Sequence, residues 1–183
     1  MKKSIYIIRH CKAKGQAPEA QLTESGFRQA EQLTEFLSDR KIERLISSPF
    51  TRAVLSVQPL SEKLTIDIEN DARLAERILS TKDFPDWPEK LEATFDDINL
   101  SFESGESSLE ATGRAVAVIE DMIRSKEENI AVVTHGNLMS LLIRHYNPGF
   151  GFKEWKSLSN PDVYLLTLEN SVANIEHIWV GQE

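Results

Sequence analysis

The chain lacks most features of secreted, membrane and nucleic-acid-binding proteins. Its 183 residues contain one cysteine, which excludes an internal disulfide and a cysteine-rich zinc site. No apolar run approaches the roughly 18 residues of a membrane span, and Arg9 and His10 end the short run Ile5–Ile8 that resembles the start of a signal peptide. The formal net charge of −8 argues against nucleic-acid or anionic membrane partners. We therefore expect a cytoplasmic globular protein with neither partner.

The length and the order of elements predict one α/β domain. Its 183 residues fit one domain of about 150 residues on the usual prior, so we expect residues 1–183 to fold together. Expected strands are 5–8, 44–47 and 129–134, with a hairpin of 163–168 and 172–180. Because strands and helices alternate, we expect a three-layer sandwich, a mainly parallel sheet with helices on both faces.

Several residues predict where helices begin. Thr23 is a candidate N-cap for a helix with Phe27 on its apolar stripe, and Ser107 with Glu110 forms a capping box before a helix with Leu109 and Ile123 on its stripe. Ser48-Pro49 predicts a third helix, kinked or shortened at Pro59, and a fourth is expected over 137–145. Residues 71–105 lack periodicity and are expected to be an irregular, lid-like insertion with short helical pieces.

The functional side chains gather at predicted strand ends. His10, Ser48 and His135 follow three of the strands, and ligands of such folds bind beyond the carboxyl ends of the strands. Arg9 and Arg52 add guanidinium groups, which suit bidentate binding of phosphate. The turn into the helix after His135 should add backbone N–H donors. We therefore expect a phosphate-binding site in which nearby positive charge keeps a histidine neutral and nucleophilic.

Four segments resemble, in order and spacing, the motifs of the histidine phosphatase superfamily, whose fold is phosphoglycerate mutase-like. The similarity runs from Ile5 to about Gly136. The segments are Ile7-Ile8-Arg9-His10-Cys11-Lys12-Ala13, Leu22-Thr23-Glu24-Ser25-Gly26-Phe27-Arg28-Gln29-Ala30, Ser47-Ser48-Pro49-Phe50-Thr51-Arg52-Ala53 and Val133-Thr134-His135-Gly136.

The resemblance implies a role for each matching residue. His10 would be the phosphorylated nucleophile, and Glu76, in Leu74-Ala75-Glu76, would protonate the leaving oxygen and then activate water. The residues expected around the substrate are Arg9, Gln16, Arg52, His135, Gly136 and Glu106. Two positions depart from the family pattern: Cys11 replaces the usual glycine, and the segment after Glu76, within 77–104, lacks the usual motifs.

These observations predict a metal-independent phosphomonoesterase that needs no cofactor and hydrolyses a small phosphorylated metabolite. Two alternatives stay open: a phosphoglycerate or sugar-phosphate mutase, and a non-catalytic module that binds a phospho-ligand or a protein. Since the resemblance implies that mutases of this family are generally longer, the compact chain favours hydrolysis over transfer. The oligomeric state, monomer or homodimer, and the substrate are left open.

Overall fold

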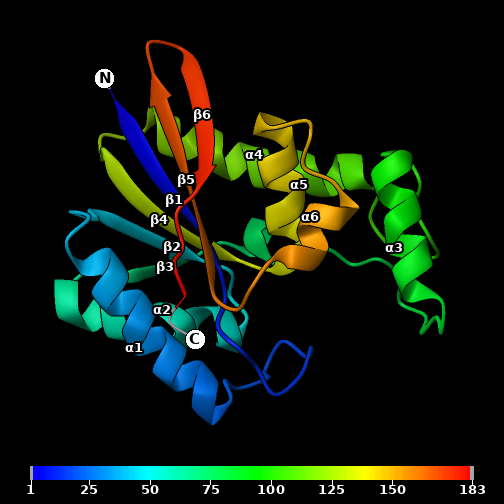
Figure 1. The fold of residues 1–183 in the computed structure, drawn as a ribbon, viewed down its shortest axis with the longest axis horizontal. Coiled ribbons are helices and arrows are strands. Elements are labelled where there is room, and N and C mark those ends of the chain that lie inside the picture. The colour runs from blue at the N-terminus through cyan, green and yellow to red at the C-terminus, as the bar shows by residue number, and fades with distance from the viewer. Residues whose placement is uncertain (1, 182–183) are drawn as a thin grey trace.

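A mixed six-stranded sheet lies at the centre of the computed structural model, which describes residues 2–181 (Figure 1). The strand order is β3-β2-β4-β1-β5-β6. The strands are β1 (Lys3–Arg9), β2 (Arg44–Ser47), β3 (Ile68–Asn70), β4 (Asn129–Thr134), β5 (Asp162–Glu169) and β6 (Val172–His177). β1 to β4 run parallel, β5 pairs antiparallel with β1, and β5 and β6 form the predicted antiparallel hairpin.

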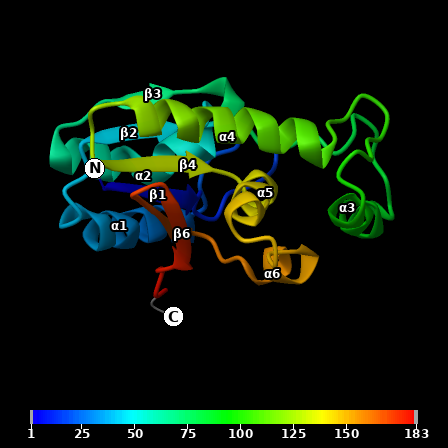
Figure 2. The ribbon, with the colours of Figure 1, turned by 90° about the horizontal axis from the view of Figure 1, so that it is seen from above.

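Helices cover both faces of the sheet, which confirms the predicted fold class (Figure 2). The helices are α1 (Glu24–Ser38), α2 (Thr51–Leu64), η1 (Ala72–Leu74), α3 (Trp87–Asp96), α4 (Ser108–Arg124), α5 (Gly136–Tyr146) and α6 (Phe152–Ser157). Successive β1 side chains point to opposite faces, so Ile5 and Ile7 pack under α4 and α5 while Tyr6 and Ile8 pack under α1 and α2. None of the described helices is long and apolar enough to cross a membrane.

Two of the three predicted helix starts are confirmed. The Thr23 hydroxyl accepts the N–H of Gly26 at 2.9 Å, and the Ser107 and Glu110 capping box is formed. The start predicted at Ser48-Pro49 is wrong: α2 has Phe50 as its N-cap, because the Ser48 hydroxyl is hydrogen-bonded to a histidine elsewhere. Pro59 does not end α2, which continues to Leu64.

The predicted apolar faces of α1 and α4 are partly wrong. Phe27, Leu109 and Ile123 are exposed. Ala30, Leu33 and Leu37 of α1 and Ile119 of α4 are buried, as the helical spacing predicts. In α4 the unpredicted Ala111, Ala115, Val118 and Met122 are buried as well. Small side chains let a helix approach the sheet closely, so burial does not follow side-chain size.

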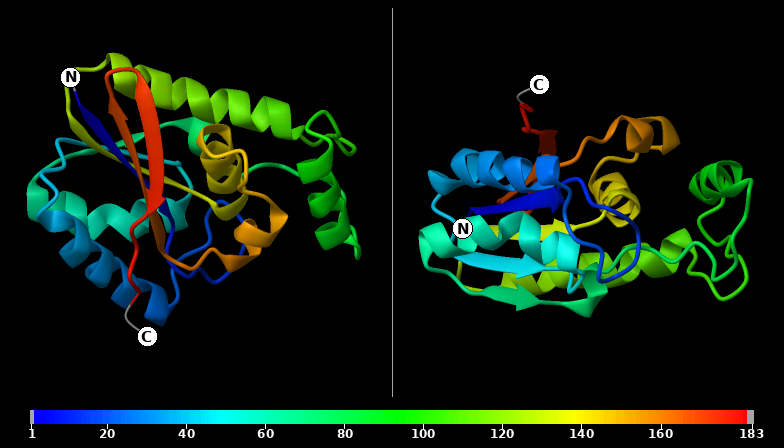
Figure 3. Two further views of the ribbon diagram at one scale, coloured as in Figure 1. Left: turned by 45° about the horizontal axis from the view of Figure 1, so that its top comes forward. Right: turned by 90° about the horizontal axis from the view of Figure 1, so that it is seen from below.

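The segment 71–105 is largely irregular, as predicted, but it contains one well-formed helix. α3 stands at the end of the molecule where α4 begins, apart from the strands (Figures 1 and 3). Leu91 and Phe95 on its inner face are buried in the core cluster beneath α4 and α5. Strand β3 and helix α6 were not predicted; both are short and have weak sequence patterns.

Candidate active site

The ends of the parallel strands bring the predicted site residues together. Arg9 lies opposite Thr134, and Ser47 opposite Val133, so His10, Ser48 and His135 follow at neighbouring positions. The N–H of His10 donates to the carbonyl of Thr134 at 3.1 Å, and the two histidine ring centroids are 5.1 Å apart.

The hydrogen bonds of His10 define its tautomer. Its Nδ1 lies 2.7 Å from the carbonyl oxygen of Cys11, which can only accept, so Nδ1 carries the proton. Nε2 accepts a hydrogen bond from Nε of Arg52 at 3.3 Å and therefore presents a lone pair. Burial lowers the pKa of His10 to about 4, the bond to Cys11 opposes this shift, and the charges of Arg52 and Arg9 add to it. His10 is thus a neutral imidazole at pH 7 with Nε2 unprotonated.

Arg52 is held rigidly beside His10. Its Nη1 donates to the carbonyls of Gln16 and Ala17, at 3.0 and 2.8 Å, and its guanidinium lies 5.1 Å from the ring centroid of Phe50. Burial lowers the pKa of this guanidinium, and the charge of Glu76 opposes the shift. The cation is therefore fixed in position before any ligand binds.

His135 is also neutral, and its ring N–H has no hydrogen-bond partner. Its Nε2 lies 2.8 Å from Oγ of Ser48. The other hydrogen bond of this oxygen comes from the N–H of Phe50, so among the described residues Nε2 is the acceptor available to the Ser48 hydroxyl proton. The ring proton then lies on Nδ1, which is buried without a partner. Burial, followed by the charges of His10 and Arg52, lowers the pKa of His135 to about 2.

The Arg9 guanidinium is fixed by a hydrogen bond through Nη1, whereas its Nε has no partner. Its Nη1 donates to the carbonyl of Leu158 at 2.8 Å, whereas its Nε is buried without a partner. A Cβ at Gly136 would lie 2.9 Å from that Nε, so only glycine allows α5 to begin this close to the guanidinium. Burial lowers the pKa of Arg9, and Glu76 and Asp162 oppose the shift.

The buried side-chain atoms that lack hydrogen-bond partners are concentrated at this site. Across residues 2–181 they are Arg9 Nε, His135 Nδ1 and both amide atoms of Asn137. Each unpaired buried polar group costs about 1–3 kcal/mol, and such groups are rare in folded proteins. Their clustering indicates a polar ligand that accepts hydrogen bonds from Arg9 and His135.

Glu76 contacts the start of α5. Its Oε2 accepts the N–H of Asn137 at 3.0 Å, and its Oε1 accepts those of Leu138 and Arg77 at 2.9 and 2.8 Å. The two α5 N–H groups were expected to face a bound anion, and this expectation is wrong, because the Glu76 carboxylate takes them. Oε2 accepts one hydrogen bond and keeps a lone pair for a proton.

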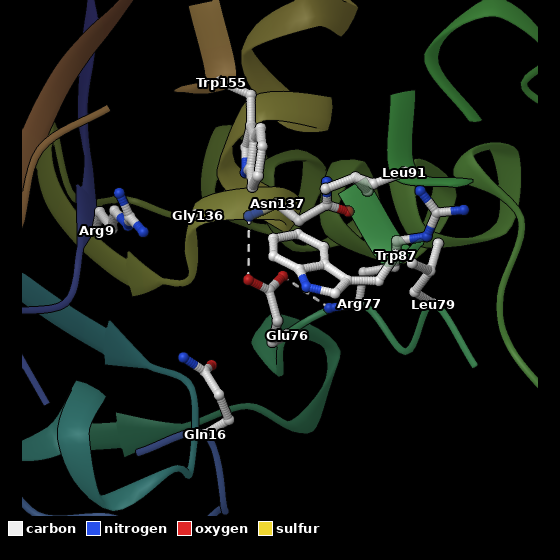
Figure 4. Close-up of a pocket in the computed structure, with 10 residues that line it drawn as sticks. All are labelled: Arg9, Gln16, Glu76, Arg77, Leu79, Trp87, Leu91, Gly136, Asn137 and Trp155. Atoms are coloured by element: carbon white, nitrogen blue, oxygen red, sulfur yellow. Dashed lines mark hydrogen bonds between the residues drawn. The ribbon is translucent and has the colours of Figure 1, made fainter. Parts of the chain in front are cut away.

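A cavity of about 500 Å³ adjoins these residues (Figure 4). Its wall consists of Arg9, Gln16, Glu76, Arg77, Leu79, Trp87, Leu91, Gly136, Asn137 and Trp155. Four of these were predicted site residues: Arg9, Gln16, Glu76 and Gly136. His10, Arg52 and His135 do not line this cavity, although His10 keeps 9% of its surface exposed.

Glu106 is set apart from the cavity wall. Its Oε1 lies 2.6 Å from Nε of Arg114, and its Oε2 accepts the N–H of Ile78 at 3.1 Å. Its carbonyl accepts two bonds from Arg77. These contacts join the start of α4 to the segment after Glu76. Glu106 is not among the residues that line the cavity, and its contact with substrate stays a prediction.

The residues that sequence reasoning missed are Asn137, Arg77, Leu79, Leu91, Trp87 and Trp155. Asn137 could have been predicted from the sequence, because it directly follows the His135-Gly136 motif. The two tryptophans carried no such signal, because they lie far apart in the sequence in segments without a motif. Only the tertiary structure brings them to one cavity.

Cys11 is compatible with the site. Its φ is not positive, so the position does not require glycine. Its N–H donates to Oγ of Ser56 at 2.8 Å, and burial raises the pKa of its thiol to about 12. The thiol is therefore protonated and unreactive at neutral pH.

These features define an α/β protein with a cationic, two-histidine anion site at the ends of parallel strands. The family model of the histidine phosphatase superfamily (branch 1) matches residues 5–179, and the chain belongs to that superfamily. Membership indicates phosphatase or phosphomutase activity. No curated protein sequence matches the chain.

Several solved structures share the fold. Mycobacterial glucosyl-3-phosphoglycerate phosphatase is 20% identical, with 97% of each chain covered and a TM-score of 0.78. Bacillus stearothermophilus YhfR is 19% identical, with 96% of each chain covered and a TM-score of 0.79. A phosphoserine phosphatase mutant from Entamoeba histolytica, solved with phosphoserine, is 14% identical, with 96% of each chain covered and a TM-score of 0.79. At these identities the similarity shows the fold alone.

Proposed function

We propose that this protein is a phosphomonoesterase that works through a phosphohistidine on His10. The observation that carries the proposal is the Nε2 lone pair of His10, which Nδ1–H bonded to Cys11 keeps unprotonated beside the buried, unpaired donors of Arg9 and His135. A neutral imidazole is a nucleophile, and these donors suit the oxygens of a phosphoryl group.

In the first step, the His10 Nε2 lone pair attacks phosphorus and the bond to the ester oxygen breaks. Arg52 donates to Nε2 in the free site, so this guanidinium must pass its hydrogen bond to a phosphoryl oxygen as the N–P bond forms. The leaving oxygen takes a proton from Oε2 of Glu76 and departs as an alcohol. Arg9, Arg52 and His135 stabilise the charge on the phosphoryl oxygens.

In the second step, water attacks the phosphorus of phospho-His10. Glu76, now a carboxylate, accepts the water proton, the P–N bond breaks, and Nε2 recovers its lone pair. The products are inorganic phosphate and the alcohol, and Glu76 is again protonated. Its three backbone hydrogen bonds hold the carboxyl group in one place through both steps.

We expect this chemistry to proceed without a metal ion. Residues 2–181 contain no group of three His, Cys, Asp or Glu side chains that could hold one. His10 and His135 are instead surrounded by arginines, and these cations would repel a divalent ion. The proposal of hydrolysis, as opposed to mutase activity, is supported by two structural neighbours that are phosphatases, of glucosyl-3-phosphoglycerate and of phosphoserine.

The test is phosphate release from p-nitrophenyl phosphate and ethyl phosphate, with and without EDTA, by the wild type and by His10→Ala. We expect EDTA to have no effect and His10→Ala to abolish release, whereas His145→Ala, an exposed imidazole at the end of α5, should match the wild type. Quenching in alkaline detergent should trap a base-stable, acid-labile phosphoenzyme in the wild type, and His10→Ala should give none. Turnover retained by a folded His10→Ala protein would refute the proposal.

A further inference from the structure

We propose that the natural substrate is a phosphate ester of an uncharged alcohol that carries a flat ring, and that this ring packs against the indoles of Trp87 and Trp155. The inference rests on the proposed function, and it specifies the half of the substrate that the phosphoryl site does not contact. Three features of the cavity beside Glu76 support it.

The first feature is an apolar wall from separate parts of the chain. Trp87 and Leu91 come from α3, Trp155 from α6, and Leu79 from the segment after Glu76. The two indoles lie edge to face, with centroids 6.3 Å apart and planes at 89°. Figure 4 shows both tryptophans beside the space that the Glu76 carboxylate enters. A leaving group protonated by Glu76 therefore contacts this wall.

The second feature is the unequal anchoring of the two indoles. Trp155 is stacked on Phe152, with centroids 5.2 Å apart, which holds its ring in place. Trp87 is 49% exposed, so about half of its indole is open to a ligand in the cavity. A ring that covers Trp87 removes apolar surface from water and forms an aromatic pair with it.

The third feature is the absence of an available cation for an acidic leaving group among the cavity-lining residues. Arg77 is 6% exposed, and its guanidinium is bonded to the Glu106 carbonyl, Thr94 Oγ1 and Ser108 Oγ. Figure 4 shows that guanidinium turned away from Glu76. Arg9, the other lining cation, belongs to the phosphoryl site. A carboxylate on the alcohol would thus lose its hydration against the apolar wall with no cation to pair with it.

One neutral polar group faces the same space. The Asn137 side chain is 8% exposed, and neither its amide nitrogen nor its amide oxygen has a partner. An amide can donate one hydrogen bond and accept another, which suits a hydroxyl or amide substituent on a ring. The cavity therefore favours a ring with neutral polar substituents.

The test compares two pairs of phosphate esters of primary alcohols. Benzyl and ethyl phosphate differ in the ring, while 4-carbamoylbenzyl and 4-carboxybenzyl phosphate have the same shape and differ in charge. We expect kcat/KM to be about tenfold higher for benzyl than for ethyl phosphate, the scale of one or two aromatic contacts. We also expect the carbamoyl ester to exceed the carboxy ester by about tenfold or more.

Variants of the two tryptophans test whether the apolar wall causes the preference for benzyl over ethyl phosphate. Trp87→Leu and Trp155→Leu should each lower the benzyl-to-ethyl ratio several-fold, while Leu109→Ala, an exposed apolar residue of α4 outside this cavity, should leave it unchanged. Equal kcat/KM for benzyl and ethyl phosphate, or a carboxy ester that matches the carbamoyl ester, would overturn the inference.

Binding to His10→Ala separates this inference from the proposed function. If no ester is hydrolysed, the proposed function fails, but tryptophan fluorescence of His10→Ala still reports binding. Tighter binding of the carbamoyl than of the carboxy ester, lost in Trp155→Leu, would support the ring pocket. Equal binding of both esters would refute it.

Discussion

Replacing Gly136 by alanine should disable the phosphoryl site while leaving the fold intact. The new Cβ would lie 2.9 Å from Nε of Arg9 and 3.0 Å from its Cζ and Nη2, closer than carbon atoms normally approach. The Arg9 guanidinium must therefore move, although Leu158 holds its Nη1. The displaced atom, Nε, is one of the buried donors left unpaired in the free site.

The magnitudes separate activity from stability. Removing one preorganised donor from a charge-stabilising site typically costs about 10²- to 10³-fold in kcat, so we expect a loss of that order for Gly136→Ala. Alanine gains up to about 1 kcal/mol of helix propensity, which offsets part of the roughly 1–3 kcal/mol cost of over-packing. The free energy of unfolding should therefore fall by no more than about 2 kcal/mol.

Gly113→Ala is the matched control. Gly113 lies within α4, where an added Cβ would meet nothing within 4 Å. This variant should be stabilised by up to about 1 kcal/mol and retain wild-type kcat. Phosphate release and urea unfolding of both variants decide the matter: a Gly136→Ala enzyme with wild-type kcat/KM would show that Arg9 need not occupy its present position.

Three further predictions concern neighbouring groups. Ser48→Ala should lower kcat about tenfold or more with little loss of stability, because His135 loses the hydroxyl that fixes its tautomer; unchanged kcat would contradict this. The pKa of His10 is about 4 in the fold against about 6.5 unfolded, so the unfolded state binds the proton first and up to about 3 kcal/mol of stability is lost as pH falls from 6.5 to 4. Urea unfolding at several pH values should show a shallower loss for His10→Asn, and parallel curves would count against the buried, neutral ring. Glu106→Gln should cost about 1–3 kcal/mol in unfolding free energy through its contact with Arg114, without the loss of phosphoenzyme expected of a substrate ligand.

The sequence by itself determined the three central parallel strands and the place where the residues of the phosphoryl site meet. Short apolar runs and caps predicted β1, β2 and β4, and these strands are parallel neighbours. Residues that follow parallel strands must meet at one edge of the sheet. Arg9, His10 and His135 could therefore be placed together from their positions alone.

The tertiary structure alone decided the tautomers of the histidines and the nature of the leaving-group cavity. Both depend on contacts between segments far apart in the chain: Ser48 with His135, Glu76 with the start of α5, and Trp87 with Trp155. No local pattern encodes such contacts, since each joins different segments of the chain; the contact between the tryptophans depends on how α3 and α6 pack at the edge of the domain. Hydrophobic spacing likewise missed the buried alanines of α4, because the closeness of helix and sheet, and not residue size, selects them.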